Sequence, residues 1–377
     1  MKPVDYMSQA LELAQLAKGY TSPNPAVGCV IVKEGRVVGT GYHRKAGTPH
    51  AEVWALKEAG DDATGSTVYV TLEPCAHYGK TPPCANTLIE RKVAKVVIAM
   101  ADPNPLVAGK GAEKLRQAGI EVEIGLLSKE AAQLNEDFIK WMLIGKPFIT
   151  AKVAMSLDGR TATRTGSSQW ITNDRARKYG HYLRSIHDGI LVGIQTVLAD
   201  NPLLTCRVPR AGNDIIHQPT RIVLDSSGQI PLTAKLIADK TAKTIVITTD
   251  ASSEEKRLQL EQAGILILMA KRSAQGIDLQ DALQQLSNIG IHSILVEGGA
   301  AVHGSFFDNR LVDKLYFFIG SMVIGGQDAV PAIGGMGANL LSQTMPLCYD
   351  KIELLENNLL ITAYNERREG AYVHWNH

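Results

Sequence analysis

Residues 71–84 read TLEPCAHYGKTPPC and place two cysteines where the chain changes its secondary structure. The preceding segment, STVYVTLE, is rich in β-branched residues and predicts a strand over 66–73. The segment that starts at Cys84, CANTLIERK, predicts a helix directly after Pro82 and Pro83. A packed core needs no such arrangement, so the stretch is a candidate functional site.

The sequence around this stretch alternates strands with helices. A hairpin is expected from AVGCVIV and RVVGTGY, joined through 33–35, and a helix from HAEVWALKEAG at 50–60. Further along, KVVIAMAD and IEVEIG predict strands, GAEKLRQAG predicts a helix, and 128–145 predict one long helix that ends at Gly145. This order predicts a three-layer α/β sandwich with a largely parallel sheet.

A second α/β domain is expected after a boundary near residue 146, where the helix stop is followed by a new strand, PFITAKVAMSLDG. Strands are predicted within 187–193, 219–227, 243–249, 265–270 and 292–299, and helices within 174–185 and 278–290. The length of 377 residues suits two domains, 1–146 and 147–377.

Composition narrows the class of protein. Apolar residues make up 45% of the chain and charged residues 20%, which is typical of a globular protein. Residues 1–146 hold 17 Lys+Arg against 16 Asp+Glu, and the remainder holds 22 against 22, so neither half has the basic excess of a nucleic-acid binder. Polar residues interrupt the N-terminal helix, and no apolar run approaches the ~18 residues of a membrane span. We therefore expect a cytoplasmic protein.

Five scattered cysteines do not suggest a disulfide framework, so they are considered for metal binding or reactivity. Cys29, Cys206 and Cys348 are expected to be small buried hydrophobic residues.

His50, Glu52, Cys75 and Cys84 form a candidate zinc site. The segment TPHAEVWAL puts His50 and Glu52 in the first turn of a helix, and both cysteines stand at helix or turn starts, where backbone N–H groups favour a thiolate. One imidazole and two thiolates are the ligands of a catalytic Zn²⁺ that leaves its fourth position to water. Glu52 would then take and return the proton of that water.

An alternative is a closed, purely structural zinc site with His77 or His43 as the fourth ligand. Such a site has no use for Glu52. A metal-free interpretation also stays open.

The order His-x-Glu, Pro-Cys, Cys resembles the signature of zinc nucleobase deaminases, although eight residues rather than two separate these cysteines. HAE followed by TLEPCAHYGKTPPC closely resembles the bifunctional riboflavin-biosynthesis deaminase/reductase family, and TSPNPAVGCVIV is similar to that family's substrate loop. The resemblance implies a cytidine-deaminase-like fold, zinc on His50, Cys75 and Cys84, Glu52 as proton shuttle, and contact of Asn24 with the pyrimidine. Asn24 could also be a turn residue between two prolines.

The second half gives weaker signals from its own residues. HSILVEGGAAVHGSFFDN leads from a strand through Gly298 and Gly299 into a helix, where a phosphate can approach the backbone, although a tight turn would look the same. Residues 151–171 form a polar, glycine-rich rim after a strand. Arg184 and Arg207 could each bind a phosphate or be a solvated surface charge.

These stretches are similar to the reductase domain of the same family, which implies a dihydrofolate-reductase-like fold that uses NADPH. The resemblance implies an NADPH site lined by Ala154, Trp170, Thr196, Asp200, Gly299, Ala300, Ala301, Val302, His303, Gly304 and Ser305. It implies that Ser168, Arg184, Leu204, Arg207 and Glu297 contact the phosphorylated substrate. Lys152 and Asp200 are our candidates for polar contacts near the reacting ribose carbon. The preference for NADPH comes from the resemblance alone.

The expected function is therefore zinc-dependent hydrolytic deamination of 2,5-diamino-6-(ribosylamino)pyrimidinone 5′-phosphate, followed by NADPH-dependent reduction of the ribosyl group to ribityl. A homo-oligomer is expected, with no nucleic-acid or membrane partner. Three alternatives are a nucleic-acid-editing deaminase with an RNA-binding second domain, a deaminase with a regulatory nucleotide-binding domain, and a non-catalytic zinc-stabilised scaffold. Salt-sensitive RNA binding would favour the first alternative, and absence of hydride transfer would favour the second. A closed four-ligand zinc site would favour the third.

Overall fold

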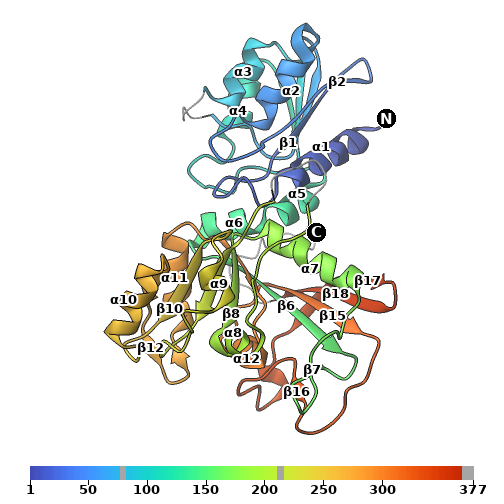
Figure 1. Cartoon of the computed structure of the whole chain (residues 1–377). Helices are drawn as coiled ribbons and strands as arrows, with labels where there is room; N and C mark the ends of the chain where they lie inside the picture. The colour runs from blue at the N-terminus through green and yellow to red at the C-terminus, as the bar shows by residue number, and fades with distance from the viewer. Residues whose placement is uncertain (77–81, 210–215, 367–377) are drawn as a thin grey trace. The chain divides into compact units, whose positions relative to one another are not determined.

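The chain divides between Ile144 and Gly145 into two units, each built on its own β-sheet (Figure 1). The structure is a computed structural model and describes residues 1–76, 82–209 and 216–366. Among these, the first unit comprises 1–144 and the second comprises 145–209 and 216–366. No helix among the described residues has the length and apolarity that crossing a membrane requires.

The first unit has a five-stranded sheet in the order β2-β1-β3-β4-β5. The strands are β1 (Gly28–Lys33), β2 (Arg36–Tyr42), β3 (Thr67–Val70), β4 (Lys95–Ile98) and β5 (Glu121–Ile124). Glu34 and Gly35, both with positive φ, form the two-residue turn of the β1–β2 hairpin. Strand β1 is antiparallel to β3 as well as to β2, whereas β3, β4 and β5 pair parallel, so β2, β3, β4 and β5 run in one direction and β1 runs against them. The predicted largely parallel sheet is therefore found except at β1, which is antiparallel to both of its neighbours.

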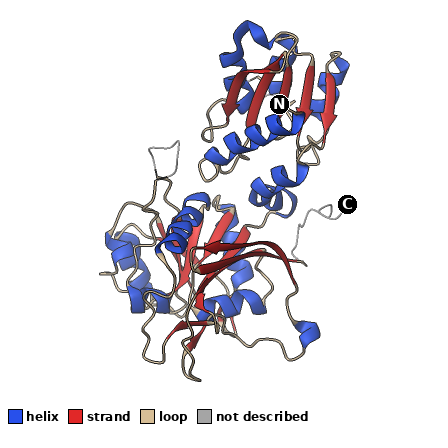
Figure 2. Cartoon of the chain, turned by 90° about the vertical axis from the view of Figure 1, so that its right-hand side faces the viewer, coloured by secondary structure: helices blue, strands red, loops and turns tan. Residues whose placement is uncertain are grey.

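Helices cover both faces of this sheet, which confirms the three-layer sandwich (Figure 2). Helices α2 (Ala51–Ala59), α3 (Cys84–Glu90) and α4 (Lys110–Gln117) pack on one face. Helices α1 (Pro3–Ala17), α5 (Ser128–Leu134) and α6 (Glu136–Ile144) contribute to the core on the other. A short 3₁₀ turn, η1 (Gly60–Ala63), follows α2.

The helix predicted over 128–145 is interrupted at Asn135, so the prediction of one continuous helix was wrong. The buried Asn135 side chain pairs with the peptide group of Ala26 instead: its Oδ1 accepts from Ala26 N at 2.8 Å, and its Nδ2 donates to Ala26 O at 2.9 Å. A side chain that bonds to a distant backbone competes with regular helix. The interruption anchors the loop that carries Asn24.

The second unit has a nine-stranded sheet in the order β11-β10-β9-β8-β14-β6-β15-β18-β17. The first seven strands in this order run parallel to one another. They are β11 (Leu266–Met269), β10 (Thr244–Thr248), β9 (Thr220–Leu224), β8 (Gly189–Gly193), β14 (Ser293–Val296), β6 (Phe148–Ser156) and β15 (Lys314–Gly320). Strands β18 (Asn358–Asn365) and β17 (Leu347–Leu355) extend the sheet antiparallel. Two small ribbons pair β7 (Arg160–Ala162) with β16 (Val330–Pro331) and β12 (Arg272–Ser273) with β13 (Gly276–Ile277).

Helices also cover this sheet on two sides. Helices α11 (Leu279–Asn288) and α12 (Ala300–Asp308) pack on one face. Helices α7 (Asp174–Ile186), α8 (Ile194–Asp200), α9 (Lys235–Ala238) and α10 (Glu254–Gln262) contribute to cores on the other, and η2 (Leu341–Gln343) is a short 3₁₀ turn. All five cysteines are free thiols, and Cys348 is exposed on the edge strand β17, so its predicted burial was wrong.

Candidate metal centre and reductase cavity

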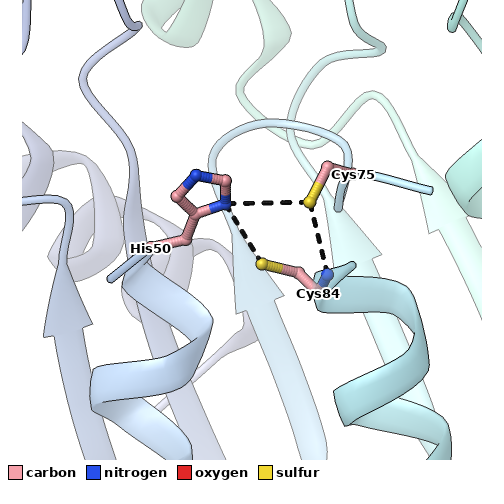
Figure 3. Close-up of side chains that lie close together, drawn as sticks. All are labelled: His50, Cys75 and Cys84. Atoms are coloured by element: carbon pink, nitrogen blue, oxygen red, sulfur yellow. Dashed lines mark hydrogen bonds between the residues drawn. The ribbon is translucent and has the colours of Figure 1, made fainter. Parts of the chain in front are cut away.

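Three side chains of the first unit point toward one another at the carboxyl end of β3 (Figure 3). His50 is the N-cap residue of α2, one position before the first turn in which it was predicted, and Cys84 is the first residue of α3. Cys75 follows β3 across a short turn. Two helix starts and one strand end therefore bring a histidine and two cysteines together.

The distances suit a tetrahedral zinc ion. His50 Nδ1 lies 3.3 Å from Cys84 Sγ and 3.7 Å from Cys75 Sγ, and the three atoms are within 4.8 Å of one another. With Zn–S of about 2.3 Å and Zn–N of about 2.0 Å, tetrahedral angles separate a nitrogen from a sulfur by roughly 3.5 Å. The two observed N–S distances lie on either side of this value. The donor set and the two N–S distances therefore fit Zn²⁺.

Electrostatics at the site favour a thiolate. The Cys84 thiol and the His50 imidazole form hydrogen bonds with the Cys75 sulfur and lower the pKa of Cys75 to about 4. The backbone N–H of Cys84 also donates to this sulfur at 3.3 Å. The neighbouring Cys75 sulfur and burial raise the pKa of Cys84, so without a metal ion one negative charge sits on Cys75. A coordinating metal ion deprotonates both thiols.

Glu52 lies in the first turn of α2 and is 3% exposed. Its carboxylate is within hydrogen-bonding reach of the Cys84 side chain. Burial raises the pKa of Glu52, and the nearby His50 imidazole opposes that shift. The carboxylate thus lies beside the three candidate ligands without being a member of their cluster among the described residues.

Asn24 and His43 form a short polar chain toward the same site. Asn24 Nδ2 is 3.3 Å from His43 Nε2, and His43 Nδ1 is 3.2 Å from Pro49 O, directly before His50. Both ring nitrogens of His43 are therefore engaged, and His43 does not belong to the ligand cluster of the described chain. His77, the other candidate for a fourth ligand, lies outside the described residues. Among the residues described, three protein ligands come together.

A cavity of about 1010 Å³ opens in the second unit at the carboxyl ends of β8, β9 and β14. Ligands of parallel α/β sheets bind at this edge. Nine residues predicted for the cofactor or substrate line it: Ser168, Thr196, Asp200, Glu297, Gly299, Ala300, Ala301, Val302 and Ser305. The volume lies at the upper end of those of small-molecule sites and suits a ligand of dinucleotide size.

Sequence reasoning missed part of the lining. Gly193 to Gln195 repeat the strand-glycine-helix pattern that drew attention to Gly298 and Gly299, so that signal was present in ILVGIQT. The hairpin of β12 and β13 also lines the cavity, with Ser273 to Gln275. Ser273, Ala274 and Gln275 carry no charge and form no motif that indicates a ligand, so only the folded chain shows that they line the cavity.

Glu297 lies at the edge of the cavity within a cluster of positive charges. Arg184 Nε and Nη2 donate to its two carboxylate oxygens at 2.8 and 2.9 Å, and Lys152 Nζ lies 3.6 Å away. Burial alone would raise the pKa of Glu297, but Arg184 and Lys152 outweigh it and lower that pKa to about 2.

The pKa values of two nearby histidines, His181 and His303, are lowered by burial and by neighbouring positively charged groups. Burial, Arg184 and Arg207 lower the pKa of His181 to about 4, and an Arg207 Nη2 atom lies 3.4 Å from its Nε2. Burial and Lys152 lower the pKa of His303 to about 4. The Glu297 carboxylate thus lies beside a lysine and an arginine, and Arg207 lies beside His181, an excess of positive charge that suits an anionic ligand.

The other predicted residues lie elsewhere. Leu204 is 4% exposed in the core beneath α8 and has a positive φ of 54°. Trp170 is 64% exposed with its ring 4.4 Å from the Arg177 guanidinium carbon, and Ala154 packs in the core under α7. The buried His303 and Gly304 lie on α12. Within the described chain these five residues are not part of the cavity lining, and neither are Lys152, Arg184 and Arg207, although the first two contact Glu297, which is.

Comparisons with known proteins match both units. Residues 2–100 match the cytidine and deoxycytidylate deaminase zinc-binding region, and residues 147–353 match the RibD C-terminal domain. The riboflavin biosynthesis protein RibD of Aquifex aeolicus is 45% identical over 358 residues, which is 95% of this chain and 97% of the relative. That of Escherichia coli K12 is 43% identical over 328 residues, 85% of this chain and 88% of the relative.

Two solved structures match this chain over 96% of its length. Acinetobacter baumannii RibD superposes with a TM-score of 0.85 at 41% identity, covering 96% of this chain and 98% of the other. A Thermotoga maritima protein described as a diaminohydroxyphosphoribosylaminopyrimidine deaminase/5-amino-6-(5-phosphoribosylamino)uracil reductase has a TM-score of 0.84 at 34% identity, with the same coverage.

Fold, site and comparisons define a two-part enzyme, a deaminase of the zinc-binding cytidine-deaminase class joined to a dihydrofolate-reductase-like reductase. The chain belongs to the RibD family of bifunctional riboflavin biosynthesis proteins. The predicted fold class, the two activities and the zinc and NADPH cofactors are confirmed.

Proposed function

We propose that residues 1–146 deaminate a diaminopyrimidinone ribosyl phosphate at the zinc centre and that residues 147–377 reduce the ribosyl group of the product with NADPH. The observation that carries the first part is the convergence of His50 Nδ1 and the two sulfurs beside the buried Glu52 carboxylate. A closed structural site would have no use for a buried carboxylate in this position.

Each deaminase residue has a distinct role in this proposal. His50, Cys75 and Cys84 hold the zinc ion, which when bound supplies a Lewis acid that activates water. Glu52 takes the proton released by that water on its carboxylate and delivers it to the departing amino group. Asn24, held by the loop that Asn135 anchors, donates from its amide to the pyrimidine. Burial of the Glu52 carboxylate keeps bulk water from competing for the proton.

Glu52→Gln tests the role of the carboxylate. The amide keeps the shape but cannot accept and return a proton, so deamination should fall by about 10²- to 10⁴-fold. Zinc content and NADPH-dependent reduction should stay at the wild-type level. The matched control is Glu58→Gln on the same helix, because Glu58 is exposed and bonds only to Thr40 among the described contacts. Parallel loss of zinc and of both activities in Glu52→Gln would contradict the assignment.

In the second unit, we assign NADPH to the cavity between α8 and α12, where Thr196, Asp200 and the segment from Gly299 to Ser305 meet. NADPH supplies the hydride when bound. Glu297 and Arg184 fix one another, and Lys152 lies beside them at the cavity edge, so these three charged groups orient the ribosyl phosphate. Arg207, exposed next to His181, adds a charge for the phosphate, and Ser168 borders the same space. Ala154, Trp170, Leu204, His303 and Gly304 stay predictions from the family resemblance.

Arg207→Ala tests the phosphate contact. A charge-assisted hydrogen bond contributes about 1.5–3 kcal/mol, so KM for the phosphorylated pyrimidine should rise by about 10- to 100-fold while KM for NADPH stays constant. Arg175→Ala, which removes an exposed arginine from the first turn of α7, is the control. An unchanged KM for the pyrimidine, or an equal rise for NADPH, would refute the contact.

We also propose a homo-oligomer that forms through an apolar face of β15, β18 and β17. Cross-strand pairing puts Phe317, Ile319, Leu359 and Ile361 on this face together with Tyr349, Ile352 and Leu354 of β17. The last three are 65%, 60% and 73% exposed, and β17 is the outermost strand. Such a face and edge suit pairing with the same face of a second copy around a two-fold axis.

Leu354→Glu should lower the molar mass in solution to that of one chain, as measured by light scattering after gel filtration. Lys351→Glu, whose side chain points to the opposite face of the same strand, should leave the oligomer intact. A wild-type protein that is monomeric at micromolar concentration would contradict the proposal.

For the location in the cell, we propose the cytoplasm, because the two thiolate ligands must stay reduced.

A further inference from the structure

Glu73 has no role in the chemistry described above, yet its carboxylate is among the most heavily bonded groups of the first unit. It lies two residues before Cys75 and three residues after the end of β3, and is 5% exposed. Its Oε1 accepts from the backbone N–H of Gly111 at 2.8 Å and of Ala112 at 3.0 Å. Its Oε2 accepts from Gly109 N at 2.9 Å and Asp102 N at 3.2 Å.

The donors show which elements the carboxylate connects. Gly111 and Ala112 belong to the first turn of α4, whose N-cap residue is Gly109 and has no side chain to accept from these groups. The first N–H groups of a helix have no partner within it, and a negative charge is favoured there. Glu73, 36 to 39 residues earlier in the chain, supplies the acceptor oxygens and the negative charge for these N–H groups. The carboxylate therefore ties the start of α4 to the strand end that carries Cys75.

Gly111 shows how closely the two segments approach. A Cβ atom at this position would lie 1.9 Å from the carbonyl oxygen of Pro74, the residue between Glu73 and Cys75. The first turn of α4 thus lies directly against the peptide group that leads into Cys75. The Glu73 side chain and the Gly111 backbone hold this peptide in place together.

We infer that Glu73 is a positioning residue that fixes the Cys75 thiolate for the metal, acting through α4 and the Pro74–Cys75 peptide. It is not itself a ligand, because its two oxygens already accept four N–H groups and it does not belong to the ligand cluster of the described residues. Groups that orient a metal ligand typically change metal affinity or activity by about 10- to 100-fold when they are removed. The inference rests on the zinc site proposed above.

Glu73→Gln is the test. The amide has nearly the same shape, but its NH₂ group would face two backbone N–H donors, so only one oxygen can accept. Zinc affinity, measured by competition between the full chain and a chromogenic zinc chelator, should fall by about 10- to 100-fold. At saturating zinc, kcat of deamination should fall with little change in KM, while reduction stays at the wild-type rate.

Three further variants separate positioning from general stability. Gly111→Ala leaves the carboxylate intact but presses on Pro74, so it should also weaken zinc binding. Glu73→Asp keeps the charge and should recover part of the lost affinity. Glu58→Gln removes an exposed carboxylate that accepts the N–H of Thr40 and should behave as wild type.

Two results would overturn the inference. One is wild-type zinc affinity and deamination kcat in Glu73→Gln. The other is a lower midpoint of thermal unfolding in the zinc-free protein, for Glu73→Gln or Gly111→Ala, without any loss of zinc affinity. A wild-type chain that binds no zinc would instead refute the proposed function, so the two failures are distinguishable.

Discussion

Arg221 illustrates how a single buried side chain can hold two loops in place. It is 1% exposed, and its guanidinium donates to Thr244 Oγ1 and to Asp239, both to the carboxylate at 2.7 Å and to the backbone oxygen at 2.7 Å. It also reaches Leu203 O at 3.5 Å, next to the predicted substrate residue Leu204. The buried charge thus fixes the loop after α9 and the loop after α8.

Arg221→Met should lower the free energy of unfolding of the second unit by about 3–5 kcal/mol, because it leaves several buried oxygens without a donor. Denaturant unfolding followed by tryptophan fluorescence measures this change. Arg272→Met, at an exposed arginine of β12, should change it by less than about 0.5 kcal/mol. Equal effects of the two substitutions would show that the burial of Arg221 contributes nothing.

Glu297 should make stability depend on pH in the acid range. Burial opposes the shift, but Arg184 and Lys152 lower its pKa from 4.5 to about 2 in the folded chain. A lowered pKa stabilises the fold fully above pH ~4.5 and loses this contribution as the pH falls toward ~2, with a total of roughly 3 kcal/mol. The difference in free energy of unfolding between wild type and Glu297→Gln should therefore shrink between pH 4.5 and 2. A difference that is constant over this range would contradict the ion-pair account.

Local sequence patterns indicated some site residues and not others, for a physical reason. His50, Glu52 and Cys84 were predictable because proline and helix-start signals lie within a few residues of each. Glu73 and Asn135 were not, because their partners are 29–39 and 109 residues away along the chain. Long-range hydrogen bonds leave no periodic pattern in the sequence.

At the scale of elements, α12 connects the cofactor cavity to a neighbouring loop. Ala301, Val302 and Ser305 face the cavity, while Gly304 lies against the loop at Gly334 and Gly335. A Cβ atom at position 304 would come within 2.3 Å of the backbone of that loop. The position of the helix at the cavity therefore depends on a glycine that does not line it.

Gly304→Ala should displace α12 or the loop and weaken NADPH binding by roughly tenfold, since overpacking of this kind typically costs 1–3 kcal/mol. Isothermal titration with NADPH measures the effect. Gly180→Ala on α7 is the control, because the nearest side-chain atom there would be 3.8 Å away. Unchanged NADPH affinity in Gly304→Ala would show that the loop at Gly334 and Gly335 moves aside without displacing α12, and would contradict the prediction.

The elements themselves were largely predictable where their pattern is local. The β1–β2 hairpin and the strand leading through Gly298 and Gly299 into α12 follow from turn and glycine signals. The break at Asn135 was not predictable, because 128–145 have an unbroken helical pattern and the cause is a bond to Ala26. The antiparallel end of the second sheet also escaped prediction, because the register shift between Tyr349 and Lys351 interrupts the alternation of polar and apolar residues in β17.

At the scale of the whole molecule, two units with separate cofactors should respond separately to metal removal. Dialysis against a chelator should abolish deamination and leave NADPH-dependent reduction of the deaminated substrate unchanged. Readdition of Zn²⁺ should restore deamination, and Mg²⁺ should not, because thiolate ligands favour zinc over magnesium. Loss of reduction on chelation would show that the second unit also depends on the metal.

The proposed zinc centre can be tested directly by X-ray absorption at the zinc edge of the wild-type chain and of Cys84→Ser. The wild type should show two sulfur ligands at about 2.3 Å and two lighter ligands at about 2.0 Å, one from His50 and one from solvent. Cys84→Ser should show one sulfur fewer. A wild-type spectrum without zinc, or a sulfur count that is the same in both proteins, would contradict the proposed centre.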